Sequence, residues 1–280
     1  VNGNSSAYTK IRQALENYDT ALTLRIRNYE EADFAQYVRQ YCMEHPGVVI
    51  ALPTISAEVY PKEGETRILE LHFSYPATRD ELSLMQSSVQ TILDSASSYI
   101  RSGETDLEKA QLLYRFLTTR FDYTVGEEAP ATPAYSLLCE GVAHSLSFAS
   151  VFYAECVAAD MECYIISGTR EGREHYWNLI RVDGEYYHVD LTRSIALGET
   201  QLVLHYTSEL LHAGFDWDLS LYPATPMPPQ SPTEDPDAPP DDPDSGENDP
   251  TEDPSTEPSA DPEVSTEETP PTNSGETENP

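Results

Sequence analysis

The chain has 280 residues and a formal net charge of −33 at pH 7, with 49 acidic against 16 basic residues. The segment after Pro229 contains 17 of the acidic residues and no Lys or Arg. The part of the chain up to Pro229 therefore has a net charge of −16. This acidity argues against a nucleic acid or an anionic membrane surface as partner, and no apolar run reaches the length of a transmembrane helix.

Residues 1–78 are predicted to form a small α/β support unit. Apolar and polar residues alternate over 22–26, which indicates a half-buried strand, and the helical stripe over 34–42 follows it. Two further strand-like runs, 55–60 and 67–75, complete the unit. It contains no pattern typical of catalysis, so we expect it to support or bind a neighbour.

Residues 79–123 are predicted to form two amphipathic helices. The first carries a long apolar stripe over 82–100. The second begins with Thr105-x-x-Glu108, the pattern of a capping box. Both stripes are expected to be buried.

A third helix is predicted after Gly141, and Ser145 extends its apolar stripe by one turn toward the N-terminus. The hydroxyl should therefore face the core, where the free N–H groups of a helix start stabilise an oxyanion or a thiolate. Taken alone, Ser145 is more typical of an N-cap than of a catalytic residue. His144 lies about 100° around the helix from Ser145 and is expected to point away.

A β-hairpin is predicted around Asp183-Gly184, a strong signal for a two-residue type I′ turn. Continuing its register places His175 opposite Thr192 and Trp177 opposite Asp190. His175 and Asp190 then share a face as diagonal neighbours. A carboxylate beside an imidazole is the base-and-orienter half of a catalytic triad.

These segments together resemble the transglutaminase-like fold of the papain-related superfamily, over roughly residues 80–224. The matching pieces are Glu140-Gly141, Ser145, Ser147-Phe148-Ala149, Phe152, Ser167-Gly168, His175-Tyr176-Trp177-Asn178 and residues 186–193. The resemblance implies an α+β fold, with an antiparallel sheet packed on the N-terminal end of a central helix.

The same resemblance implies the site residues. The nucleophilic cysteine of the family falls on Ser145, and its catalytic histidine and aspartate fall on His175 and Asp190. Trp177 and Asn178 are implied as substrate-binding residues.

The chain also departs from the motif of the family. Besides Ser145 in place of Cys, Ser147 stands for Gly, Phe148 for Tyr, Tyr176 for Ala and Arg193 for Trp. A single Cys-to-Ser change could be an engineered knockout, but the further changes fit a natural sequence that has lost the need for thiol chemistry. Tyr176 is expected to add bulk beside His175.

The chain has four cysteines, which allow three disulfide pairings between which the sequence does not choose. Cys42 and Cys156 lie in helical stripes and are expected to be buried thiols. No Cys-x-x-Cys spacing indicates zinc or redox chemistry, and we expect neither a metal nor a cofactor. His188 is expected to be an ordinary strand histidine outside the site.

Residues 225–280 consist of Pro, Asp, Glu, Thr, Ser, Gly and Asn with almost nothing apolar. Such a segment cannot bury enough surface to offset its ordering entropy, so we expect a disordered, extended acidic linker. Its composition is similar to the linkers of bacterial surface proteins. We therefore expect three regions, 1–78, 79–224 and 225–280, in an extracellular or cell-surface bacterial protein.

The first functional hypothesis is a catalytically inactive transglutaminase-like domain, retained to bind a peptide, a protein or a cell-wall ligand. A cysteine at such a site has its pKa lowered from about 8.5 to about 3.5–7.5, whereas an alcohol gains no comparable ionisation. The alternatives are an acyl hydrolase or transferase that uses Ser145, His175 and Asp190, and a mutated cysteine peptidase or acyltransferase. A purely structural spacer is the remaining class.

The composition of residues 225–280 generates a first testable prediction. In the isolated protein, limited proteolysis should cleave this segment first, and its amides should exchange without protection, because it lacks the apolar residues needed for a core. Mass spectrometry of both reactions checks this, with residues 79–120 as the internal control. A protease-resistant tail would contradict the prediction.

Overall fold

The computed structural model describes residues 1–120, 124–125 and 128–229. The predicted acidic linker therefore lies outside the described residues, apart from its first positions, 225–229. Residues 1–229 pack into one compact unit. The division of this unit at residue 78 stays a prediction.

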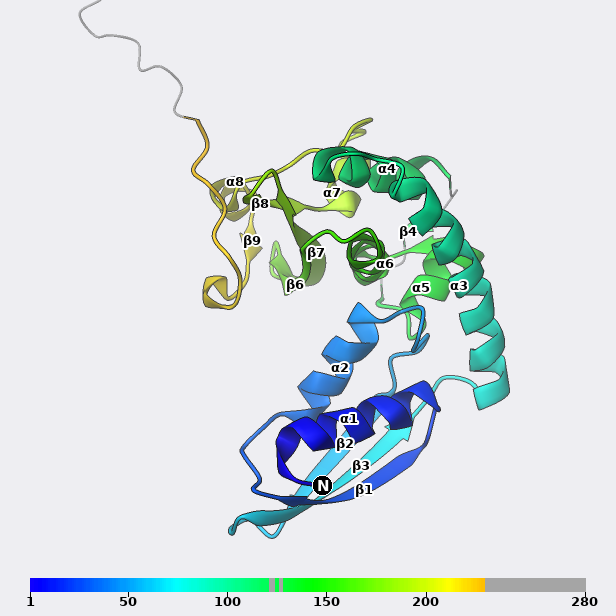
Figure 1. Ribbon diagram of the computed structural model, residues 1–280. Helices are drawn as coiled ribbons and strands as arrows, with labels where there is room; N and C mark the ends of the chain where they lie inside the picture. The colour runs from blue at the N-terminus through cyan, green and yellow to red at the C-terminus, as the bar shows by residue number, and fades with distance from the viewer. Residues whose placement is uncertain (121–123, 126–127, 230–280) are drawn as a thin grey trace, which may run out of the picture. The chain divides into compact units, whose positions relative to one another are not determined.

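The N-terminal part is built on an antiparallel sheet of order β1-β3-β2. Its elements are α1 (Gly3–Glu16), β1 (Ala21–Arg27), α2 (Phe34–Glu44), β2 (Thr54–Tyr60) and β3 (Thr66–Ser74) (Figure 1). The predicted strands and the helix over 34–42 are confirmed. The structure adds α1, which sequence reasoning missed and which buries Ala7, Ile11 and Leu15.

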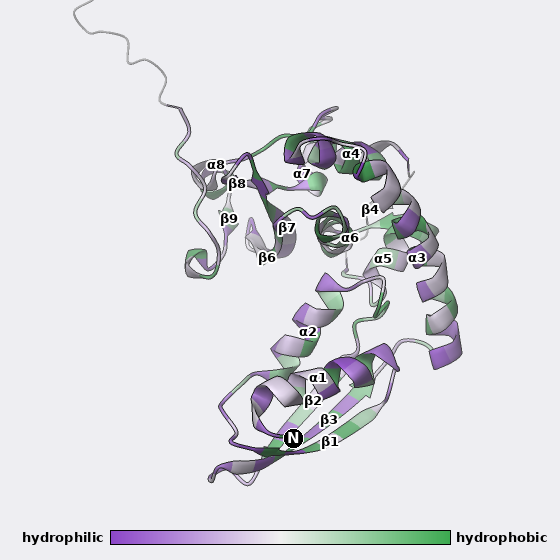
Figure 2. Cartoon of the chain, in the orientation of Figure 1, coloured by the Kyte–Doolittle hydropathy of each residue, from purple (hydrophilic) through white to green (hydrophobic). Residues whose placement is uncertain are grey.

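Two helices follow, α3 (Arg79–Ile100) and α4 (Asp106–Thr119). Both begin with a capping box, the predicted one at Thr105 and Glu108 and another at Thr78 and Glu81. Each helix carries hydrophilic and hydrophobic stretches along its length (Figure 2). Their apolar stripes are buried, as amphipathic helices on a core require.

Short elements lead to the central helix. They are β4 (Thr124–Val125), α5 (Pro133–Tyr135), a π-helical turn (Ser136–Glu140) and β5 (Val142–Ala143). The central helix, α6 (Ser145–Ala158), contacts α2, α3, α4, β6 and β7, so it is buried on most of its surface rather than along one stripe. This burial makes α6 the centre of the core.

A second antiparallel sheet packs on α6, with strand order β8-β7-β6-β9. Its strands are β6 (Cys163–Arg170), β7 (Arg173–Val182), β8 (Glu185–Val189) and β9 (Phe215–Asp216). The chain also forms α7 (Leu191–Ala196), α8 (Thr207–His212) and a 3-10 turn (Leu219–Leu221). The predicted α+β class, with an antiparallel sheet on a central helix, is confirmed.

The predicted hairpin turn is confirmed. Val182 pairs with Glu185, and both Asp183 and Gly184 have positive φ values, 52° and 89°, as a type I′ turn requires.

The four cysteines are unpaired, with Cys42, Cys156 and Cys163 buried and Cys139 exposed. The buried thiols predicted at Cys42 and Cys156 are thus confirmed. Within the described part of the chain, no helix combines the length and the apolar character needed to cross a bilayer.

One carboxyl group lies inside this core. Glu155 of α6 is only 1% exposed, and its Oε2 accepts a hydrogen bond of 2.9 Å from Ser97 Oγ. Burial raises the pKa of Glu155 to about 7, although Ser97 and Arg101 oppose this. Because the folded state binds this proton more tightly than the unfolded state, the free energy of unfolding should fall as pH rises from the ordinary pKa of 4.5 to about 7.

Replacing Glu155 by Gln should therefore stabilise the fold above pH 7. We expect Glu155→Gln to raise the free energy of unfolding at pH 8 by up to roughly 3 kcal/mol, and to have little effect at pH 4. Urea unfolding at both pH values measures this, with Glu104→Gln as the control because Glu104 is exposed. Equal effects at the two pH values would contradict the assignment of a raised pKa to Glu155.

Candidate functional site

Ser145 is the first residue of α6, and the N-cap of this helix is His144. The Nδ1 atom of His144 accepts a hydrogen bond of 3.2 Å from the backbone N–H of Leu146. The interpretation of Ser145 as an N-cap is therefore wrong, because an imidazole supplies the acceptor. Ser145 is 6% exposed. Its hydroxyl instead accepts a hydrogen bond of 3.3 Å from the backbone N–H of Tyr176.

His144 lies in the wall of the cavity that Ser145 lines, so the expectation that it points away is wrong. Its backbone is extended, with φ −138° and ψ 155°, and the angular step of a helix does not apply to it. Burial and the neighbouring His175 lower the pKa of His144. The imidazole is thereby kept in the neutral form that can accept the bond from Leu146.

His175 and Asp190 form the predicted side-chain contact. His175 Nε2 donates to Asp190 Oδ2 at 2.7 Å. Asp190 is 2% exposed, which by itself raises its pKa, but the hydrogen bond and charge of His175 and the bonds from Thr192 and Arg193 lower the pKa overall. Asp190 is therefore a carboxylate near neutral pH, and His175 is left with Nδ1 as its free ring nitrogen for proton transfer.

The strand register that predicted this contact does not extend as far as expected. The β7–β8 pairing ends at Asn178 and Val189, because Asp190 leaves the strand to cap α7. The expected pairs of His175 with Thr192 and of Trp177 with Asp190 do not form. Thr192 nonetheless comes within 3.4 Å of His175, from Oγ1 to Nε2.

The second oxygen of Asp190 is used in the cap. Asp190 Oδ1 accepts hydrogen bonds from the backbone N–H groups of Thr192 at 3.0 Å and Arg193 at 3.2 Å, and from Thr192 Oγ1 at 2.6 Å. One carboxylate thus fixes the start of a helix and the orientation of an imidazole.

Trp177 and Asn178, implied as substrate-binding residues, lie in the core and do not line the cavity. Each is 1% exposed. The Trp177 ring stacks beside the His175 ring, with centroids 6.0 Å apart. Asn178 Nδ2 donates to the carbonyl oxygen of Ala149 at 3.0 Å, tying β7 to α6. Trp177 thus packs beside the imidazole and Asn178 joins the strand to the helix, both from within the core.

His188 supports Trp177 in turn and lies outside the cavity, as expected. It is 1% exposed, and its Nδ1 accepts from Trp177 Nε1 at 3.1 Å. Burial, together with His205, lowers the pKa of His188 to about 4, so the ring is a neutral acceptor at pH 7.

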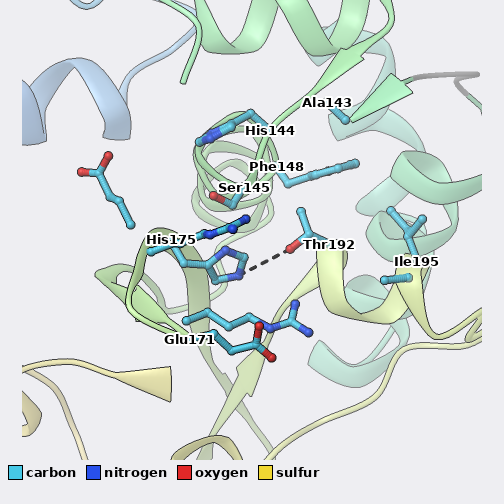
Figure 3. A pocket seen from close by; sticks show the side chains of 12 residues that line it. Ala143, His144, Ser145, Phe148, Glu171, His175, Thr192 and Ile195 are labelled. Carbon is cyan, nitrogen blue, oxygen red and sulfur yellow. Dashed lines mark hydrogen bonds between the residues drawn. The ribbon is translucent and has the colours of Figure 1, made fainter. Parts of the chain in front are cut away.

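The cavity over these residues has a volume of about 380 Å³ (Figure 3). It is lined by Ala143, His144, Ser145, Phe148, Arg170, Glu171, Arg173, Glu174, His175, Thr192, Ile195 and Ala196. Ser145, His175 and Thr192 come together there from α6, β7 and α7 (Figure 3). Thr192 was missed as a site residue, although the matched Val-Asp-x-Thr segment contains it.

Two of the departures from the family motif lie away from the cavity. The ring of Tyr176 packs on Met43, Leu146 and Ala149, so its expected bulk beside His175 is wrong. Ser147 is fully buried, and the described residues offer its hydroxyl no hydrogen-bond partner. The cavity wall itself is therefore little altered by either residue.

The described residues contain no group of three or more His, Cys, Asp or Glu side chains that could hold a metal ion. A hydroxyl at a helix start, an imidazole and a carboxylate that orients it form the arrangement of a nucleophile, a base and an orienting group.

The sequence comparison covers the same part of the chain. Residues 94–191 match the model of the transglutaminase-like superfamily. This part of the chain is therefore similar to the transglutaminase-like superfamily. No curated protein matches the chain in sequence.

Solved structures show only distant similarity. A structure described as a TGase is 12% identical with a TM-score of 0.31, covering 68% of this chain and 58% of its own. A candidate cysteine protease from Cytophaga hutchinsonii is 14% identical with a TM-score of 0.33, covering 55% and 65%. A candidate protease from Parabacteroides distasonis ATCC 8503 is 8% identical with a TM-score of 0.28, covering 60% and 39%. The chain spans less than two thirds of each.

The double role of Asp190 generates a prediction about stability. Asp190→Ala removes the cap of α7 and the partner of His175, and should lower the free energy of unfolding at pH 7 by about 2–4 kcal/mol. Asp190→Asn keeps an acceptor for the cap and should cost less. Because the folded pKa of Asp190 is lowered, its contribution is present above the ordinary value of 3.8 and is lost as pH falls further, so Asp190→Asn should also flatten this acid dependence.

Urea unfolding between pH 3 and pH 7 measures both effects. Asp218→Ala is the matched control, since Asp218 also caps a helical turn but is exposed. If Asp190→Ala were no more destabilising than Asp218→Ala, the central role of the buried carboxylate would be refuted.

Proposed function

We propose that this chain presents a transglutaminase-like domain that binds peptide or cell-surface ligands without thiol catalysis. One observation carries the proposal: the imidazole–carboxylate pair is complete, while the hydroxyl of Ser145 occupies the place of the nucleophile. At such a position a thiol ionises, because its pKa drops from about 8.5 to about 3.5–7.5. A hydroxyl does not, so the site keeps its shape without an anionic nucleophile.

The hydrogen bond from Tyr176 further favours an inert hydroxyl. The backbone N–H of Tyr176 donates to Ser145 Oγ, which engages one lone pair of the oxygen that would have to attack. This bond from the strand that carries His175 thus stabilises the unreacted hydroxyl. This is a stable arrangement for a domain that binds without turnover.

The cavity suits a peptide ligand. Phe148 and Ile195 form an apolar part of the cavity wall, and Arg170 and Arg173 add positively charged groups to the lining. Apolar surface with a few polar groups is the usual lining of a binding pocket. A partner at the bacterial cell surface, as the composition of residues 225–280 suggests, is part of the proposal.

A serine hydrolase or acyltransferase is the second candidate, favoured by the His175–Asp190 pair. In that mechanism His175 Nδ1 takes the proton of Ser145 Oγ, the oxygen bonds to the acyl carbon, and the leaving group departs with a proton from the imidazolium. Water or an amine then releases the acyl group. The hydroxyl would have to exchange its bond with Tyr176 for one with His175.

The two candidates differ in the activity expected of the unmodified protein, and a thiol at position 145 tests the site geometry that both assume. The protein as it stands should turn over peptide substrates negligibly. Ser145→Cys should introduce a thiol that reacts with iodoacetamide near neutral pH, and adding His175→Ala should return the reaction to the profile of an ordinary thiol, whose pKa is about 8.5. The pH dependence of alkylation, followed by mass spectrometry, measures this.

All variants should also carry Cys139→Ser, because Cys139 is the exposed cysteine. Ser145→Ala in this background gives the residual reactivity of the buried thiols. Turnover or fluorophosphonate labelling of the unmodified protein, abolished by Ser145→Ala, would replace the proposal with the serine-hydrolase candidate. An ordinary thiol in Ser145→Cys would contradict the proposal, because the site would then have lost its geometry as well as its nucleophile.

A further inference from the structure

Arg39 connects the N-terminal part of the chain to the strand that carries His175. It lies on α2, 137 positions before Tyr176 in sequence, and its guanidinium donates a hydrogen bond to the hydroxyl of Tyr176. It also lies 3.2 Å from Glu174 Oε1. Tyr176 donates its own hydroxyl to the same Glu174 oxygen at 2.6 Å, so the three side chains form a closed cluster.

The cluster holds both neighbours of His175 in β7. Successive side chains of a strand point to opposite faces, so Glu174 and Tyr176 leave the backbone opposite to His175, although Glu174 also reaches the wall of the cavity. Joining their ends limits the rotation of the backbone between them. That backbone segment sets the direction in which the imidazole enters the cavity.

The cluster also acts on Ser145 through the backbone of Tyr176. The ring of Tyr176 is buried against Met43 of α2 and against Leu146 and Ala149 of α6. Its N–H group donates to Ser145 Oγ. A shift of the ring would therefore move the donor that holds the hydroxyl.

The contacts of Arg39 differ in strength. The ion pair with Glu174 is exposed, with 49% and 59% of the two side chains accessible, and contributes little alone. The bond to Tyr176 is partly buried, and Tyr176 is 1% exposed as a residue. Burial and the bond to Glu174 raise the pKa of Tyr176, so its hydroxyl stays protonated and can donate to Glu174.

We propose that Arg39 is a positioning residue, through which the N-terminal part of the chain holds His175 and the Tyr176 N–H group in place at the site. The placement itself follows from the contacts of Arg39. Only its effect on a reactive group at position 145 rests on the proposed function.

The first test measures the Tyr176 N–H group in the full chain by NMR amide exchange. Arg39→Gln and Tyr176→Phe should each accelerate the exchange of this amide by about fivefold, the scale of one typical hydrogen bond. The double variant should be no faster than either single variant, because both remove the same connection. The midpoint of thermal unfolding, measured in parallel, separates this local effect from global destabilisation.

Arg181→Gln is the matched control. Arg181 lies on the same strand and forms a comparably exposed ion pair with Glu162, 3.5 Å apart with 50% and 42% of the side chains accessible. Arg181→Gln should leave the exchange rate of the Tyr176 amide unchanged. Equal exchange of this amide in the unmodified, Arg39→Gln and Tyr176→Phe proteins would overturn the proposal.

The second test uses the thiol introduced by Ser145→Cys in the Cys139→Ser background. Arg39→Gln should slow its alkylation near neutral pH severalfold and shift the pH profile upward, and Arg39→Lys should restore part of the loss. If the Ser145→Cys thiol is activated and Arg39→Gln leaves the pH profile of its alkylation unchanged, the proposed role of Arg39 is overturned. If the thiol is not activated even with Arg39 present, the proposed function fails, and the amide-exchange result alone decides this inference.

Discussion

The buried carboxylate of Asp190 is the group on which the geometry of the site depends. It lies where β8 ends and α7 begins, with one oxygen on the N–H groups of the helix and the other on His175. A carboxylate that is 2% exposed is stable only with such partners, because burial alone would favour its neutral form. One carboxylate therefore maintains both the helix start and the orientation of the imidazole.

The pairing of His175 with Asp190 does not depend on the hydroxyl of Ser145. Asp190 and His175 are held by the cap of α7 and by the rings of Trp177 and Phe215, none of which involves position 145. Ser145 contributes only its bond from Tyr176 to the same region. The imidazole–carboxylate pair is thus held by contacts of the fold and not by the hydroxyl at position 145.

The central helix connects the site to the N-terminal part of the chain. Helix α6 carries Ser145 at its start and contacts both the sheet of the site and α2. Met43 and Arg39 of α2 reach Tyr176 from the side opposite to the cavity. The support role of the N-terminal part stays a prediction, and the proposed positioning of His175 by Arg39 is one form of it.

The sequence by itself determined the features that depend on nearby residues. These are the strands and helices with clear periodicity, the capping box at Thr105, the Asp183-Gly184 turn and, through the family motif, the pairing of His175 with Asp190. Each is encoded within a few residues or within one hairpin. Only the tertiary structure decided where β8 ends, that His144 caps α6, and that Trp177 and Asn178 are covered. It alone brought Arg39 to Tyr176, because the contact joins segments 137 positions apart and depends on how α2 packs against α6.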